Sequence, residues 1–218
     1  MTVPLRRLVR IRAGGLAALA AAFLLVVTEV AWAAVTDNMY PTYNASRPCR
    51  DDPDGGDGIL SCQTDNREVY YYMDSGGTYE LESPDRTIVS DMLRDDYAPT
   101  DLARHYDSSP TFSGDAETDI IYQEGSTNIG SSSDGVTWCN DAVDARRCDQ
   151  QYIRIRGNGY YTPGLSCHET GHAVGLTHGQ QADPKLNQTD SRLGCLQTPV
   201  SYGTGLGANN RENINGAY

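Results

Sequence analysis

The strongest limit on the fold of this 218-residue chain comes from a short histidine-rich run. Three of its four histidines, His168, His172 and His178, fall within eleven residues. Residues four apart on a helix lie about 40° apart around its axis, so His168 and His172 can direct their rings at one metal ion. Gly175 can take the left-handed conformation that ends a helix and turns the chain back. His178 can then reach the same ion.

The residue types in this run predict a reaction as well as a metal. Three neutral imidazoles and one water make an open zinc site of the catalytic kind. Glu169 follows the first histidine, so its carboxylate is expected beside the ion rather than on it. Zinc lowers the pKa of a bound water towards about 7 and polarises a carbonyl. The sequence therefore predicts peptide hydrolysis by a zinc-bound water, with Glu169 as the general base that passes the proton to the leaving amine.

The same residues carry a family resemblance. The run from His168 to His178 resembles the extended zinc signature of the metzincin clan of metallopeptidases, His-Glu-x-x-His-x-x-Gly-x-x-His, at every specified position. Together with Cys167 and the later Gly194–Leu196, it is similar to small secreted bacterial metalloproteases of the snapalysin-like kind. Those proteases typically carry Asp at the third ligand position, where this chain has His178.

The resemblance implies a zincin-like single domain. Such a domain has a twisted mixed sheet of about five strands with two main helices, and the active-site helix lies between two lobes. Substrate would bind extended along an edge strand, for which Val136–Cys139 is the candidate. Metzincins also place a Met in a tight turn beneath the zinc, but this chain has no Met after Met92. Leu196 is expected to supply that apolar floor instead, tied to the residue before His168 by a Cys167–Cys195 disulfide.

Two residues near the run have open interpretations. Gly171 costs a helix about 1 kcal/mol against Ala. It either admits a close backbone approach or is a tolerated weakness. Tyr202 either places its hydroxyl near a developing oxyanion or serves packing. His105 is isolated in a strand-like stretch and is expected to lie outside the site.

The amino-terminal segment has the three parts of a secretory signal peptide. Basic residues between Arg6 and Arg12 precede an uncharged, mostly apolar run, Ala13–Val27, and then the small residues of Ala31–Ala33. This pattern predicts a signal peptide over residues 1–33 and a secreted, extracellular domain over residues 34–218. An uncleaved membrane anchor is the alternative, although Glu29 interrupts the apolar run early.

All six cysteines follow the predicted signal peptide. An even number in an exported chain favours three disulfides. Six cysteines allow 15 pairings, and the sequence does not choose among them. Proximity favours the pairs Cys49–Cys62 and Cys139–Cys148, which leave Cys167 for Cys195.

The net charge and the composition restrict the classes of molecule that this protein is expected to bind. The formal net charge is −12, which argues against nucleic-acid binding, because neutralising phosphates needs clustered Lys and Arg. The expected partner is a protein or peptide substrate, with no membrane contact after signal cleavage; the oligomeric state is open. The segment Asp51–Gly58 could bind Ca²⁺ through its aspartates, but it lacks the twelve-residue loop ending in Glu, which favours a solvated acidic turn.

Local patterns predict one α+β domain. Residues 34–67 are expected to form an extended arm stapled by a local disulfide. Strands are expected at 68–73, 102–106, 119–123, 136–139 and 151–156, and helices at 83–97, 165–176 and near 210–217.

Two further functions compete with a secreted zinc endopeptidase. The first is a catalytically silent zincin-like module that binds zinc and acts through interaction. The second is a structural zinc site, in which reduced Cys167 would be the nearest fourth ligand.

Overall fold

The structure is a computed structural model that describes residues 36–52, 62–114 and 116–218. The predicted signal peptide over residues 1–33 lies outside the described residues, and so does most of the acidic segment 51–58. The described chain forms one compact unit, Thr36–Tyr218. No helix in the described ranges is long and apolar enough to cross a membrane.

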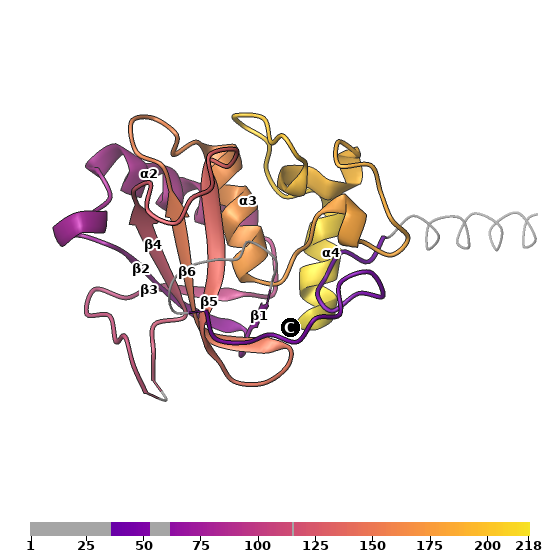
Figure 1. Cartoon of the computed structure of the whole chain (residues 1–218), viewed down its shortest axis with the longest axis horizontal. Helices are drawn as coiled ribbons and strands as arrows, with labels where there is room; N and C mark the ends of the chain where they lie inside the picture. Colours follow the sequence, from indigo (N-terminus) through magenta and orange to yellow (C-terminus); the bar gives the residue numbers. More distant parts are fainter. Residues whose placement is uncertain (1–35, 53–61, 115) are drawn as a thin grey trace, which may run out of the picture. The chain divides into compact units, whose positions relative to one another are not determined.

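A six-stranded sheet organises this unit (Figure 1). Strands β6, β4, β2 and β3 lie side by side in that order, while β1 and β5 both pair with β6. The strands span β1 Gln63–Thr64, β2 Glu68–Met73, β3 Ala103–Tyr106, β4 Ile120–Glu124, β5 Gly135–Ala142 and β6 Arg147–Ile155. The five expected strands are therefore all present, with β5 and β6 longer than the sequence indicated.

The strand pairing contradicts the expected twisted mixed sheet of about five strands. Four of the five strand pairings are parallel, and only the pairing of β5 with β6 is antiparallel. A strand–helix–strand crossover makes neighbouring strands parallel, which is how β2 and β3 are joined. Single-strand patterns in the sequence do not encode the direction of the partner strand.

Three α-helices complete the described unit. They are α2 Ser83–Met92, α3 Pro163–Ala173 and α4 Ala208–Ala217. Helix α2 continues into a π-helical turn at Leu93–Tyr97. Ser83 is the first helical residue of α2, and Glu82 takes the N-cap position. Helix α3 ends three residues earlier than the expected Leu176, because Gly175 turns the chain with φ 98°.

Helix α3 lies between the sheet and the carboxyl-terminal part of the chain (Figure 1). Eight of its residues are buried, including the ligand candidate His168. One apolar core joins β2, β4, β6, α2 and α3 to the short helical turn Ser191–Leu196 and to α4. The helix that carries the histidine motif is therefore packed on two sides, which limits its movement.

The disulfide prediction is confirmed. Cys49 is bonded to Cys62, Cys139 to Cys148, and Cys167 to Cys195, so no cysteine is free. The first bond staples the arm and the second closes the β5–β6 hairpin. The third joins α3 to the turn Ser191–Leu196.

Part of the expected extended arm forms a strap along the loop that follows α3. This amino-terminal strap, Thr36–Ala45, makes isolated antiparallel bridges, Asp37 with Asp183 and Met39 with Leu176. The Tyr40 N–H also donates to the Gly175 carbonyl at 2.8 Å. The strap therefore fixes the segment that carries His178 to the rest of the fold.

Candidate metal centre

The first two histidines project from one face of α3. The helix starts with Pro163 after Thr162, whose hydroxyl accepts the Leu165 N–H at 3.1 Å. Pro at the first helical position and a Thr cap both favour a helix start at this point. His168 and His172 lie one turn apart, with ring centroids separated by 4.7 Å.

The third histidine arrives through the turn after α3. The Gly175 N–H donates to the His172 carbonyl at 3.1 Å, and the Leu176 N–H donates to the Gly171 carbonyl at 2.7 Å. These bonds close the helix end and reverse the chain. The His178 ring comes to rest with its centroid 4.6 Å from that of His172.

The three rings converge through their Nε2 atoms. The Nε2 of His172 lies 3.2 Å from that of His168 and 3.1 Å from that of His178, and the third separation is 3.1 Å. Three nitrogens about 2.0 Å from a tetrahedral ion lie about 3.3 Å from one another. The spacing thus matches three ligands of one ion, and these histidines could hold a metal.

Hydrogen bonds at the other ring nitrogens fix which nitrogen faces the centre. His168 Nδ1 donates to the Cys195 carbonyl at 2.7 Å, and His172 Nδ1 donates to the Leu176 carbonyl at 2.8 Å. A carbonyl only accepts, so these Nδ1 atoms carry the protons. The Nε2 lone pairs of both rings therefore face the centre, as metal ligation requires.

Burial keeps the rings uncharged. Removal from water lowers the pKa of His168 to about 4 and holds the pKa of His172 well below its usual value. The pKa of His178 is lowered by the same cause. Neutral rings are the form that binds a metal. Together with the spacing and the lone pairs, this donor set fits a transition metal ion, for which imidazole is a preferred ligand.

Glu169 lies beside this group and is only 5% exposed. Its Oε2 accepts the Thr137 hydroxyl of β5 at 2.7 Å. Burial raises the pKa of Glu169 to about 7, although the bond from Thr137 acts in the opposite direction. Glu169 lines the same cleft as the three histidines. A carboxylate at this position can exchange a proton with a molecule in the cleft.

The cleft has a volume of about 670 Å³. Its lining includes the start of β5 and the Gly/Ser-rich loop before it. Residues 198–200, Tyr202 and Leu165 of α3 also line it. Strand β5 pairs only with β6 among the described strands, but Asp52 donates its N–H to the Cys139 carbonyl at 2.8 Å, so only the part of β5 before Cys139 has no such partner there. The candidate edge strand Val136–Cys139 thus lies in β5, beside the histidine group.

The residues beneath the histidines form an apolar floor. Leu196 is fully buried, and a Cβ added to Gly171 would lie 2.7 Å from its Cδ2. Of the two interpretations of Gly171, the close approach is therefore observed, but a side chain rather than a backbone makes it. The Cys167–Cys195 bond joins this floor to α3 directly before His168.

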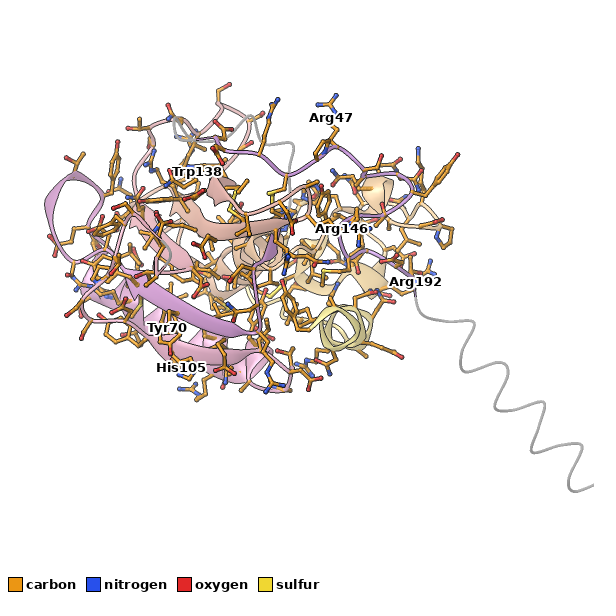
Figure 2. All side chains as sticks on the ribbon, turned by 90° about the horizontal axis from the view of Figure 1, so that it is seen from below. Arg47, Tyr70, His105, Trp138, Arg146 and Arg192 are labelled. Atoms are coloured by element: carbon orange, nitrogen blue, oxygen red, sulfur yellow. A yellow bond between two sulfur atoms is a disulfide. The ribbon has the colours of Figure 1, made fainter. Side chains whose placement is uncertain are left out.

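Other candidates separate clearly from the site. His105 lies on β3, stacked on Tyr70 at 4.8 Å, with its Nε2 2.9 Å from Glu68 Oε2 (Figure 2). It does not line the cleft. Tyr202 does line it and is 70% exposed, which excludes a place in the core. Cys167 is bonded to Cys195 and provides no thiolate, so the structural zinc site with a reduced Cys167 is wrong.

The calcium prediction concerns residues that are only partly described. Asp51 Oδ1 accepts the Ala142 N–H at 2.8 Å, and the aspartates from residue 53 onward lie outside the described residues. A second acidic group, Asp65, Asp119 and Asp149, has ligand-type atoms within 4.8 Å of one another. The sequence patterns did not indicate this group, because its members are far apart along the chain.

Sequence reasoning also missed Thr137, since its partner Glu169 is 32 residues away. In sequence comparisons, no family model and no curated protein matches the chain. The candidate site therefore rests on the geometry of its own residues.

Proposed function

We propose that this protein is a secreted zinc-dependent endopeptidase related to the metzincins. The observation that carries the proposal is the approach of three histidine Nε2 atoms to 3.1–3.2 Å, beside a buried Glu169 in an open cleft. Three protein ligands leave one position of a tetrahedral ion for water or substrate, which distinguishes a catalytic zinc site from a structural one.

Each residue of the group has one role in the proposed reaction. His168, His172 and His178 hold the ion, which when bound would lower the pKa of a water and polarise the substrate carbonyl. Glu169 is the general base: it takes the proton of the attacking water and gives it to the leaving amine. Peptide hydrolysis then needs no covalent enzyme intermediate.

The first part of β5, Gly135 to Thr137, supports a peptide substrate, because among the described strands β5 pairs only with β6. Backbone N–H and C=O groups on an unpaired edge can add an extended peptide as a further strand. The edge borders the same cleft as Glu169, because Gly135, Val136 and Thr137 line it. A peptide bond paired there would lie close to the histidine group.

Two features support secretion and the metzincin relationship. All six cysteines are in disulfides, which persist in oxidising compartments outside the cytosol. Gly175, with φ 98°, turns the chain towards the third histidine, and Leu196 packs beneath Gly171, where the resemblance led us to expect an apolar floor in place of the family's Met.

The central test compares the wild-type protein with Glu169→Gln. The amide keeps the size of the side chain but cannot act as a base, so we expect casein cleavage to fall by about 10²–10⁴-fold. Zinc content, measured by elemental mass spectrometry, should stay at one ion per chain. A chelator should abolish cleavage by the wild-type protein, and added zinc should restore it.

The outcomes separate the competing functions. Equal activity of Glu169→Gln and wild type would refute the mechanism. Stoichiometric zinc without any cleavage, across a peptide library, would favour the catalytically silent interaction module. If the purified protein contained no transition metal, both the peptidase and the zinc-binding interaction module would lose their support.

A further inference from the structure

Thr137 of β5 makes an unusual pair of contacts with Glu169. Its hydroxyl oxygen lies 2.7 Å from Glu169 Oε2 and 3.0 Å from the Glu169 backbone carbonyl oxygen. Both residues are buried, with exposed fractions of 7% and 5%. A single side chain on the strand therefore reaches both the carboxylate and the backbone of the proposed base.

These two contacts hold the Glu169 side chain close to its own backbone carbonyl. A hydroxyl has one proton to donate and two lone pairs to accept with. The Thr137 proton can therefore go to either Glu169 oxygen, since both lie within hydrogen-bond distance.

The backbone of the same strand closes the other side of the carboxylate. A Cβ added to Gly135 would lie 2.6 Å from Glu169 Oε1. Gly135 and Thr137 are two positions apart on β5 and so share one face of the strand. The Gly135 backbone lies against Oε1, and the Thr137 hydroxyl lies against Oε2. Together they restrict the orientation of the Glu169 carboxylate.

We propose that Thr137 is a positioning residue for the general base, holding the Glu169 carboxyl group in place beside the three histidines. This inference rests on the proposed peptidase function. It assigns a second role to β5, since the strand that borders the cleft would also orient the base. Substrate and base would then share one rigid frame, which favours a productive geometry.

The test replaces the hydroxyl without changing the shape of the strand. Thr137→Val keeps the β-branched side chain and removes the donor, whereas Thr137→Ser keeps the hydroxyl. We expect kcat for a peptide substrate to fall roughly 10-fold to 100-fold in Thr137→Val, with KM within about twofold of wild type. Thr137→Ser should recover most of the rate. Zinc content should remain at one ion per chain in both variants.

Thr170→Val is the matched control. Thr170 is the next residue on α3, is also buried, and its hydroxyl contacts Tyr122 and the Ser166 carbonyl rather than the Glu169 side chain. Its loss should lower the melting temperature and leave kcat within about twofold of wild type. This control separates the loss of a buried hydroxyl from the loss of this particular contact.

Every outcome decides the proposal. A selective fall of kcat in Thr137→Val, with recovery in Thr137→Ser, supports it. Wild-type kcat in Thr137→Val overturns the positioning role and leaves the peptidase function intact. Equal losses in the Val and Ser variants also overturn it, because packing rather than the hydroxyl would then matter. If Thr137→Val does not fold, Thr137→Ser decides alone: near wild-type kcat supports the role of the hydroxyl, and a large fall overturns it. A wild-type protein without chelator-sensitive cleavage overturns the peptidase function itself.

Discussion

Gly171 shows how tightly the residues beneath the histidines are packed. It lies in the helix between His168 and His172, and an added Cβ would come within 2.7 Å of Leu196 Cδ2. Leu196 is fully buried, so its side chain has little space to move away. Glycine at position 171 therefore leaves space for the Leu196 side chain, although glycine is a poor helix former.

We predict that Gly171→Ala destabilises the protein although Ala is the better helix former. The helix gains about 1 kcal/mol from the exchange, but overpacking a filled core costs typically about 1–3 kcal/mol. Urea unfolding should show a net loss of stability, which the second substitution Leu196→Ala should partly relieve. If Gly171→Ala were more stable than wild type, the Leu196 side chain would have to move aside at little energetic cost.

The candidate ligands could be predicted from the sequence, whereas their supporting contacts could not. The spacing of His168, His172 and His178 follows from helix geometry and one turn, which are local properties. Thr137 and Cys195 contact Glu169 and His168 across 32 and 27 residues, and no local pattern encodes those approaches. Tertiary packing decides them.

At the scale of elements, hydrogen bonds join the amino-terminal strap to the loop after α3. Asn38 is fully buried, and its Nδ2 donates to the Thr177 carbonyl at 3.1 Å. The Thr177 N–H donates back to the Asn38 carbonyl at 2.8 Å. The Asn38 Oδ1 accepts side-chain N–H groups from Asn209, Asn210 and Asn213 of α4. Three distant segments thus meet directly before His178.

We predict that Asn38→Ala loosens the third ligand. The substitution leaves several buried polar groups without their partner, which should lower the free energy of unfolding by about 3 kcal/mol. Zinc affinity, measured by competition with a chromogenic chelator, should fall by about tenfold or more. Unchanged affinity would show that the loop holds His178 without the strap.

Asn44→Ala is the control for this prediction. Asn44 belongs to the same strap but makes one side-chain bond to the loop, from Nδ2 to the Ala182 carbonyl at 2.7 Å. We expect it to cost about 1 kcal/mol of stability and to leave zinc affinity within a few-fold of wild type.

Element positions were largely predictable, and the exceptions have local causes. The expected strand 68–73 matches β2, and α4 begins two residues before the expected 210. The sequence Asn140–Gln150 is polar and charged and did not resemble a strand. It nevertheless extends the β5–β6 hairpin, stabilised by the Cys139–Cys148 bond and the Arg147–Asp144 ion pair.

At the scale of the whole molecule, the Cys167–Cys195 disulfide joins α3 to the turn Ser191–Leu196 in the carboxyl-terminal part of the chain. It spans 28 residues, and chain-entropy arguments give such a loop about 3.6 kcal/mol of stabilisation. The Cys195 carbonyl also accepts the His168 Nδ1–H. The same residue therefore contributes to both global stability and ligand orientation.

We predict that replacing Cys167 and Cys195 together with Ala lowers stability by about 3–4 kcal/mol and weakens zinc binding. The comparison variant replaces Cys139 and Cys148, whose loop of 9 residues gives about 2.6 kcal/mol. That variant should lose stability but keep its zinc affinity. Denaturant unfolding and chelator competition measure the two effects, and equal zinc affinities in both variants would contradict the prediction.

The arrangement of the whole sheet was the least predictable level. Alternating and apolar patterns locate strands such as β4 and β6, but their order depends on contacts between distant segments. The expected mixed sheet gave way to a mostly parallel one because the connection through α2 returns the chain in the same direction.

The joining of Asn38 to Asn209–Asn213 also has a consequence for the order of events during synthesis. Partners in this cluster are separated by 171 to 175 residues. A ribosome releases the strap early, but the asparagines that fasten it emerge only after α4 has been translated. The strap can therefore pair with the loop that carries His178 before α4 exists, and its bonds to α4 are added only after residue 213 has been translated.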